Sequence, residues 1–382
     1  MVSFAECLDP GPSEIDQCTG RYISRFPSGA YCYKNGSVKT LVKTQFLSPG
    51  ITYTVNLVFK FIFLNDVGKC HPISLKYKLK GETENSVSHL AYKREDGWYM
   101  TELYQFTSDQ SIVDLEILFD GYRGSYAIIE VEGIAFWPLE EVVEHKDEKL
   151  PISDSDESWE EKLPTDYEDI MNWSMKKVPL TTKKEMYSII CKGFLINDGQ
   201  EWFSLDKNGR KCHMLSARAA YIKGRKHTHL MSFPESRFGE VAVLKLWTFR
   251  ILIRIQPELL SSQTTYASYL VYKLPKDQSG FEAPVRVTDR EYLDYNHLWY
   301  IYLVGPRIPV IRLKANESTN NQLNRPHIKG LPQQRSDGWM EVQIWEFQTI
   351  CITKMIPISL KFSSCANKPE GLIIQGVEHR PM

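Results

Sequence analysis

The sequence has little that is typical of an exported, membrane-bound or redox-active protein. No stretch approaches the ~18 consecutive apolar residues of a membrane-spanning helix. The first residues, MVSFAECLDPGPSEIDQC, lack the basic and apolar regions of a secretory signal. The eight cysteines are scattered and form no CxxC pair. We therefore expect a protein of the cytoplasm or nucleus, without a membrane span, whose cysteines are free thiols.

Signatures of catalysis and of cofactor binding are missing as well. The sequence contains no phosphate-binding loop, no HRD or DFG of a kinase, no GxSxG elbow and no HExxH. His227 and His229 could present two imidazoles on one face of a strand, but no third metal ligand lies at a suitable spacing. We expect a protein that is not an enzyme, with no catalytic residue, no metal site and no cofactor.

The net charge of −1 hides an uneven distribution. Residues 140–169 contain 13 Asp or Glu and 3 Lys, together with two prolines, and show little apolar periodicity. Such a stretch is typical of a solvated linker whose charges keep it extended. The rest of the chain is mildly basic without a clustered basic stripe, so we expect no specific binding of nucleic acid.

Two parts of the chain resemble each other. Residues 48–61 (SPGITYTVNLVFKF) align without a gap against residues 261–274 (SSQTTYASYLVYKL). In the same order follow EDGW at 95–98 and SDGW at 336–339. This period is too long for a solenoid of small repeats and favours two related domains. We expect a shortened domain at 1–138, an acidic linker at 139–178 and a complete domain at 179–382.

Period-two alternation of apolar and polar residues predicts antiparallel strands with one buried face. Residues 53–61, 249–255 and 340–344 show this pattern. One helix is also predicted: Thr181 or Thr182 can cap its start, Glu185 lies at the capping-box spacing from Thr182, and Gly193 can end it. A weaker helical pattern covers residues 166–177.

The two Asp-Gly-Trp motifs each precede an alternating segment. Asp-Gly is typical of a turn, so the Trp that follows is predicted to be the first core residue of a strand. We expect this structural role, rather than ligand stacking, for the following residues: Asp96, Gly97, Trp98, Asp337, Gly338 and Trp339.

Several blocks of the C-terminal part occur together in one known family. They are KCHMLSARA (211–219), PESRF (234–238), TTYA (264–267), YLVYK (269–273), RSDGWME (335–341) and GLIIQG (371–376). This part, from about Lys183 onward, closely resembles the plant phloem protein 2 family, which is related to the Nictaba lectin. The first copy resembles only the later two-thirds of such a domain. We expect it to begin near Tyr22 and to lack an equivalent of the MLSAR strand.

The resemblance implies an all-β protein of two antiparallel, jelly-roll-like sandwiches, with a short helix or two before the second. It also implies binding of N-acetylglucosamine oligosaccharides or glycoproteins in the cytoplasm and nucleus. Some members of the family carry F-box or kinase domains beside this module. The resemblance further assigns Arg218, within the Ser-Ala-Arg strand, to the structural motif.

The sugar site is where this chain departs from the family. Sugar-binding relatives have tryptophans just after the Ser-Ala-Arg strand, whereas residues 221–233 here contain none and are basic. The penultimate strand of the second copy also lacks the family's carboxylates. The resemblance leaves these residues as candidates for sugar contacts: Tyr221, Lys223, Arg225, His227, His229 and Phe233. An alternative hypothesis is a protein-interaction or adaptor module that has lost sugar binding, as the accessory part of a kinase-linked homologue.

Overall fold

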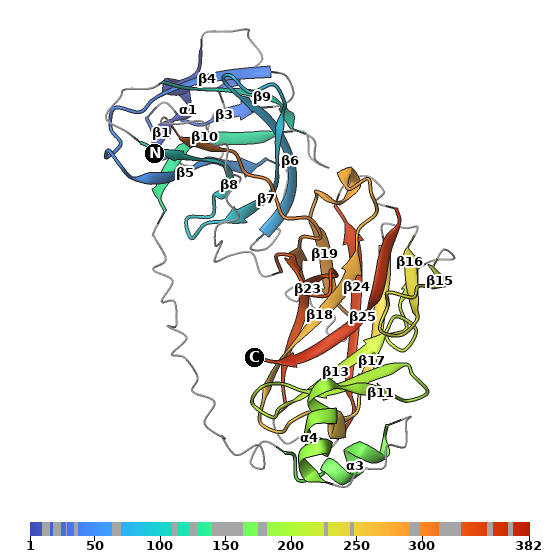
Figure 1. Ribbon diagram of the computed structural model, residues 1–382. Helices are drawn as coiled ribbons and strands as arrows, with labels where there is room; N and C mark the ends of the chain where they lie inside the picture. Colours follow the sequence, from blue (N-terminus) through green and yellow to red (C-terminus); the bar gives the residue numbers. More distant parts are fainter. Residues whose placement is uncertain are drawn as a thin grey trace. The chain divides into compact units, whose positions relative to one another are not determined.

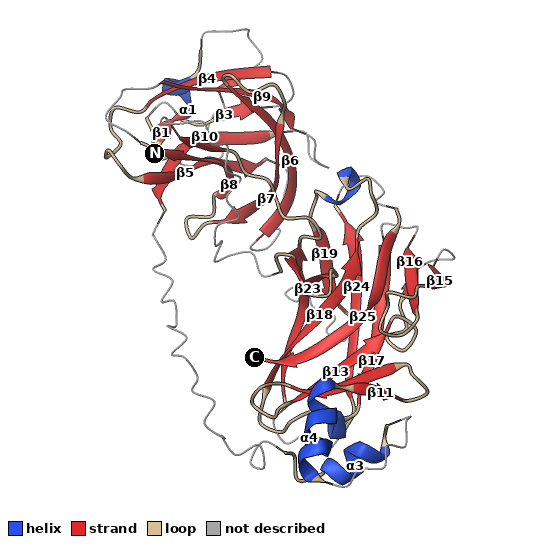
Figure 2. Ribbon diagram, in the orientation of Figure 1, coloured by secondary structure: helices blue, strands red, loops and turns tan. Residues whose placement is uncertain are grey.

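The computed structural model shows a chain built mainly of strands (Figures 1 and 2). It describes residues 1–382 except 10–15, 18–23, 28, 34–36, 63–69, 109–113, 123–127, 140–162, 175–181, 225–227, 245–247, 291–297, 313–329, 350–353 and 366–369. The chain divides into two compact units. Unit 1 comprises Met1–Glu144 and Pro306–Asn324, and unit 2 comprises His145–Gly305 and Arg325–Met382.

Unit 1 is a single antiparallel sheet in the order β2-β3-β10-β5-β8-β7-β6-β9-β4, with β1 beside β10 and β21 parallel to β8. Its elements are β1 (Val2–Ser3), α1 (Phe4–Cys7), β2 (Asp16–Gln17), β3 (Tyr31–Tyr33), β4 (Ser37–Lys43), β5 (Thr52–Phe61), β6 (Cys70–Leu79), β7 (Ser86–Lys93), β8 (Tyr99–Thr107), β9 (Asp114–Tyr122), β10 (Ile129–Pro138) and β21 (Val310–Arg312). Alternate residues of β5, including Val55, Leu57 and Phe59, are buried in one core with residues of β4, β6 and β9. The sheet therefore packs as two layers around this core.

Unit 2 contains two sheets. One has the order β11-β12-β13-β25-β18-β23-β22, with β16 on β25 and β15 on β16, and the other has the order β14-β17-β24-β19-β20. Its elements are α3 (Tyr167–Asn172), α4 (Lys183–Lys192), β11 (Phe194–Ile196), β12 (Glu201–Leu205), β13 (Lys211–Ser216), β14 (Lys223–Gly224), β15 (Thr228–Ser232), β16 (Glu240–Leu244), β17 (Thr248–Ile255), η1 (Pro257–Leu259), β18 (Thr265–Lys273), η2 (Ser279–Phe281), β19 (Val285–Asp289), β20 (Leu298–Ile301), β22 (Gln333–Gln334), β23 (Met340–Gln348), β24 (Ile356–Ser364) and β25 (Leu372–Pro381).

The apolar faces of the two sheets of unit 2 share one core. Ile251 and Ile253 on β17 pack in the same cluster as Leu270 on β18 and Val377 on β25. This arrangement is an antiparallel β-sandwich, and it confirms the predicted fold class.

Both predicted helices form. Thr182 Oγ1 accepts the N–H of Glu185, and the Glu185 carboxylate accepts the N–H of Thr182, so α4 begins with the predicted capping box. Gly193 ends α4 with a φ of 76°. The weaker pattern gives the shorter helix α3, whose Ile170 is buried against the base of unit 2.

The structure corrects the expectation that the first copy lacks a counterpart of the MLSAR strand. In unit 1, Ser3 of β1 pairs with Gly133 of β10. In unit 2, Ser216 of β13 pairs in the same way with Gly376 of β25. Two residues are too few to show any periodicity, so this strand could not be predicted from the pattern of apolar residues. Counterparts of β11 and β12 are not found among the described residues of unit 1.

Other expectations concern single residues and segments. Five described cysteines are free thiols, but Cys32 is disulfide-bonded, so the expectation of free thiols is wrong at that residue. That expectation rested on the missing signal and not on which cysteines the fold brings together. The expected linker lies outside the described residues at 140–162 and 175–178. Among the helices that the structure describes, none is both long and apolar enough to cross a membrane.

Candidate functional site

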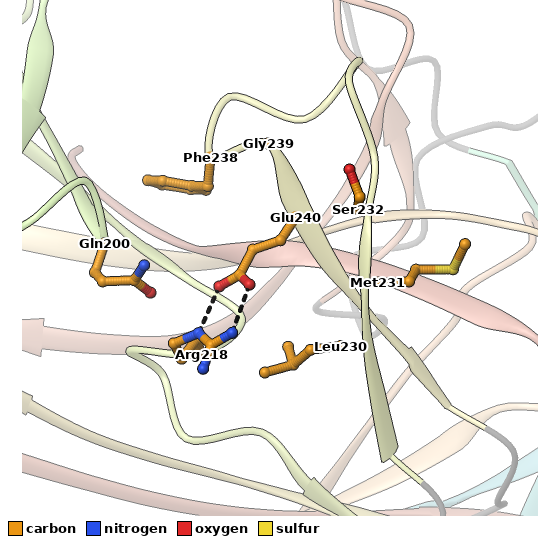
Figure 3. A pocket seen from close by; sticks show the side chains of 8 residues that line it. All are labelled: Gln200, Arg218, Leu230, Met231, Ser232, Phe238, Gly239 and Glu240. Atoms are coloured by element: carbon orange, nitrogen blue, oxygen red, sulfur yellow. Dashed lines mark hydrogen bonds and ion pairs between the residues drawn. The ribbon is translucent and has the colours of Figure 1, made fainter.

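A cavity of about 360 Å³ opens at the edge of unit 2, beside the strand β15 (Figure 3). Its walls come from the turn before β12, the turn after β13, the strand β15 and the turn that leads into β16. The residues that line it are Gln200, Arg218, Leu230, Met231, Ser232, Phe238, Gly239 and Glu240.

An ion pair forms the polar floor of this cavity. Arg218 Nε donates to Glu240 Oε1 and Arg218 Nη2 donates to Glu240 Oε2, both at 2.7 Å. The hydrogen bonds from Arg218 lower the pKa of the Glu240 carboxyl, and the same bonds raise the pKa of the guanidinium. Two parallel bonds fix the planes of both groups, so their remaining N–H and oxygen positions have a defined direction.

The backbone positions Gln200 and Glu240 through two tight turns. Asn197, Asp198 and Gly199 all have positive φ and bring Gln200 to the start of β12. Ser216 Oγ at the end of β13 donates to Gln200 Oε1 at 2.9 Å and so fixes the amide. In the second turn, Ser236 Oγ donates to the carbonyl oxygen of Glu240 at 2.8 Å.

The outer wall of the cavity is apolar. Leu230 lies on the side of β15 that faces Arg218, whereas Met231 points away from it (Figure 3). Both side chains are exposed. A wall of this kind beside fixed donors and acceptors suits a ligand that carries both hydroxyl groups and apolar C–H surfaces. The described residues of the lining thus offer hydrogen-bond donors and acceptors beside apolar side chains.

The predicted sugar-contact residues do not form this cavity. Tyr221 is 52% exposed with a φ of 42°, and His229 is exposed on β15, but neither lines the cavity. Only the backbone of Lys223 is described, in β14, and Arg225 and His227 lie outside the described residues.

Phe233, the remaining candidate, is held within the domain. Its ring lies 5.8 Å from that of Trp339, and Lys273 Nζ lies over it at 5.3 Å. It therefore packs in the domain and does not form an open stacking surface.

Sequence reasoning missed most of the cavity. Arg218 was assigned to the structural motif, but here it supplies the fixed guanidinium of the floor. The sequence motifs do not include Gln200, Leu230 or Glu240. One signal was present: Glu240 lies two residues after the end of the PESRF block, and a charged residue between a turn block and an apolar strand is a reasonable candidate for a site.

The structural role of the Asp-Gly-Trp motifs agrees with the geometry. Asp337 Oδ1 accepts the N–H of Trp339 at 3.1 Å, and Asp96 Oδ1 accepts the N–H of Trp98 at the same distance. Both tryptophans are buried. Gly338 has a φ of 81° and Gly97 a φ of 80°, a region that glycine enters without strain.

Unit 2 is thus an antiparallel β-sandwich with an open, partly polar cavity at its edge. The family described as phloem protein 2 matches residues 210–381. Three Arabidopsis thaliana proteins are similar over 59–60% of the chain. F-box protein PP2-B10 is 33% identical, with 59% of this chain and 80% of the relative covered. Putative F-box protein PP2-B12 is 31% identical (60% and 84%) and F-box protein SKIP3 is 30% identical (59% and 76%). The chain belongs to the phloem protein 2 family.

One solved structure can be aligned with the whole chain, but its geometry differs, as its low TM-score shows. The tandem CBM22-1–CBM22-2 domain of Paenibacillus barcinonensis Xyn10C is 10% identical with a TM-score of 0.22, and the match covers 100% of this chain and 96% of that chain.

Proposed function

We propose that this protein binds carbohydrate without transforming it, and that N-acetylglucosamine oligomers are its ligand class. The observation that carries the proposal is the cavity in which the Arg218–Glu240 pair and the Gln200 amide lie beside the apolar wall of Leu230. Sugar hydroxyls are recognised by such fixed planar groups, and sugar C–H faces by apolar side chains. We place the protein in the cytoplasm or nucleus.

The test is calorimetric titration of the full chain with chitin oligomers. Arg218→Gln and Glu240→Gln each remove one member of the ion pair, and we expect about tenfold weaker binding from the loss of charge-assisted hydrogen bonds. Arg254→Gln is the matched control, because Arg254 is exposed on β17 in the other sheet. The absence of saturable binding, or an equal effect of all three substitutions, would contradict the proposal.

We also propose that the two units are copies of one sandwich and that only unit 2 has the sugar cavity. The shared registers of Ser3 and Ser216, each opposite a glycine, support the first part. For the second part, the position of Arg218, two residues after Ser216, is occupied in unit 1 by Ala5. Binding of one chitin oligomer per chain in the titration would support this division, and binding at two equal sites per chain would contradict it.

The second candidate function is an adaptor that binds other proteins and has lost sugar binding. It is favoured by the lining of the cavity, which contains no Trp and only one aromatic side chain, Phe238. A stack on one aromatic ring is worth roughly 1 kcal/mol or more, so its absence weakens sugar binding. The names of the F-box relatives are consistent with protein partners. Partners that stay bound in excess chitin oligomers would support the adaptor, and release of the partners would support the lectin.

A further inference from the structure

The strands β8 of unit 1 and β23 of unit 2 are paired with a neighbouring strand in the same way. Phe106 of β8 lies opposite Tyr53 on β5. Likewise, Phe347 of β23 lies opposite Tyr266 on β18. Each tyrosine hydroxyl accepts the N–H of the residue five positions earlier, at 3.0 Å in unit 1 and 2.8 Å in unit 2. The corresponding residues of the two strands are Gln105 and Glu346, Phe106 and Phe347, and Thr107 and Gln348.

In unit 1 the other edge of β8 is occupied by β21. This strand runs parallel to β8, with Val310 beside Gln105 and Ile311 beside Phe106. The N–H of Gln105 donates to the carbonyl oxygen of Pro309 at 2.9 Å. Gln105 and Phe106 are only 4% and 1% exposed. An extended segment beside β8 thus provides an acceptor for its outward N–H and lies against its aromatic side chain.

The corresponding edge of β23 is open. Among the residues that the structure describes, the only strand on this side is β22, which pairs with Met340 and Glu341 at the start of β23. Each residue from Glu346 to Gln348 is more exposed than its counterpart on β8. Because Glu346 corresponds to Gln105, its N–H points to this edge, and no described residue accepts it there. An unpaired strand edge of this kind is a template for pairing with another chain.

Aromatic side chains beside the edge add apolar surface. The rings of Trp345 and Trp299 lie 5.5 Å apart, and both side chains are half-buried at the margin of the core. Phe347 is half-buried as well and stacks on the ring of Tyr266 at 5.5 Å. On β8 the residue at the position of Trp345 is Tyr104, which is 0% exposed. A strand added beside β23 would therefore cover apolar area that is now in contact with water.

We propose that the open edge of β23 binds an extended segment of a partner protein as an added parallel strand. The pairing of β21 in unit 1 indicates the chemistry of that segment. It offers a carbonyl oxygen to the N–H of Glu346, as Pro309 does to Gln105, and two residues later a branched apolar side chain beside Phe347. Main-chain hydrogen bonds supply affinity in this mode of recognition, and the alternate side chains supply specificity. No residue of this edge lines the cavity, so the proposal is independent of sugar binding.

The test is amide hydrogen exchange in the full chain, with a peptide of the sequence of residues 307–312 (RIPVIR) as the probe. Without peptide, and relative to intrinsic rates, we expect the amide of Glu346 to exchange about tenfold faster than that of Gln105, because only Gln105 has an acceptor on this side. With peptide at about 1 mM, exchange at Glu346 should slow by about the same factor. A peptide of the same composition in scrambled order should have no effect.

Two variants at one position separate the main chain from the side chain. Glu346→Pro removes the outward N–H, and proline is tolerated on an edge strand where that group faces away from the sheet. Glu346→Ala keeps the N–H and is the matched control. In calorimetric titration we expect the peptide to bind about tenfold more weakly to the proline variant than to the alanine variant. Near-ultraviolet circular dichroism checks that both variants are folded.

Three results would overturn the proposal. The first is slow exchange at Glu346 without peptide, which would show that the edge is already covered by this chain or, where the protection is lost on dilution, by a second copy. The second is unchanged exchange at Glu346 with the peptide present. The third is equal affinity of the peptide for the proline and alanine variants, since binding would then not use the strand edge.

Discussion

Gly376→Ala tests the contact between β13 and β25 on which the cavity depends. Gly376 lies on β25 between β13 and β18 and pairs with Ser216 and Val271. A Cβ atom built at this position would lie 2.0 Å from the carbonyl oxygen of Leu215 and 3.0 Å from its carbonyl carbon. Both atoms belong to the backbone, so β13 as a whole must move by about 1 Å or more to restore van der Waals contact.

The cost of this movement can be estimated from what β13 buries. Forcing an extra methyl group into a packed core costs typically about 1–3 kcal/mol. Met214 and Leu215 are 0% and 4% exposed, and fully burying such a side chain is worth about 1.5–3 kcal/mol. We expect Gly376→Ala to lower the free energy of unfolding of unit 2 by about 3–5 kcal/mol. Because Arg218 lies two residues after the end of β13, the proposed sugar binding should weaken as well.

Gly133→Ala in unit 1 provides the matched comparison. Its Cβ would lie 2.2 Å from the carbonyl oxygen of Val2, a clash of nearly the same depth. However, β1 has only two residues and can move at lower cost, so we expect a loss of about 1–2 kcal/mol. Guanidinium unfolding measures both, and amide hydrogen exchange assigns each transition to its unit. A Gly376→Ala loss below about 1 kcal/mol, or equal losses in both variants, would refute the reasoning.

Three further predictions concern single residues. Thr182→Ala removes the capping box of α4 and should cost about 1 kcal/mol, seen as faster amide exchange in the first turn of α4. Asp337→Ala leaves the N–H of Trp339 without its acceptor and should lower the free energy of unfolding by about 1–3 kcal/mol, measured by thermal unfolding. Asp337→Asn keeps a side-chain oxygen as acceptor and should lower it much less. Burial lowers the pKa of His89 from 6.5 to about 4, so the unfolded chain takes up this proton at higher pH than the folded chain. The free energy of unfolding should therefore fall as the pH drops from 6.5 towards about 4, and His89→Gln should flatten this dependence.

Local signals in the sequence predicted the parts of the fold that local interactions determine. The alternation of Phe249, Ile251 and Ile253 with the residues between them predicts a strand with one buried face. In the structure these three side chains are buried on one face of β17. The capping box of Thr182 and Glu185 involves residues three positions apart, and it forms as predicted. Such features depend on neighbours in sequence, so one sequence is sufficient to find them.

The cavity could not be predicted in this way because its residues come together only in the folded sheet. Gln200, Arg218 and Glu240 come from three separate turns, and their contacts depend on the pairing of β13 and β16 with β25. The strand β1 was missed for a related reason, since two residues carry no periodicity and only the register with Gly133 identifies them. The disulfide at Cys32 likewise depends on proximity in the fold and not on spacing.

The proposal that the two units are copies of one sandwich accounts for what they share and where they differ. Lys60 Nζ lies 4.6 Å from the centre of the Trp98 ring, and Lys273 Nζ lies 4.9 Å from that of Trp339. A lysine thus lies over the tryptophan of the Asp-Gly-Trp motif in both units, at a distance at which a cation attracts an aromatic ring. The cavity residues have no such role in the sheet, and unit 1 has Ala5 where unit 2 has Arg218. Function can therefore differ between the units while the frame is kept, and substitutions at Arg218 should change binding with little effect on folding.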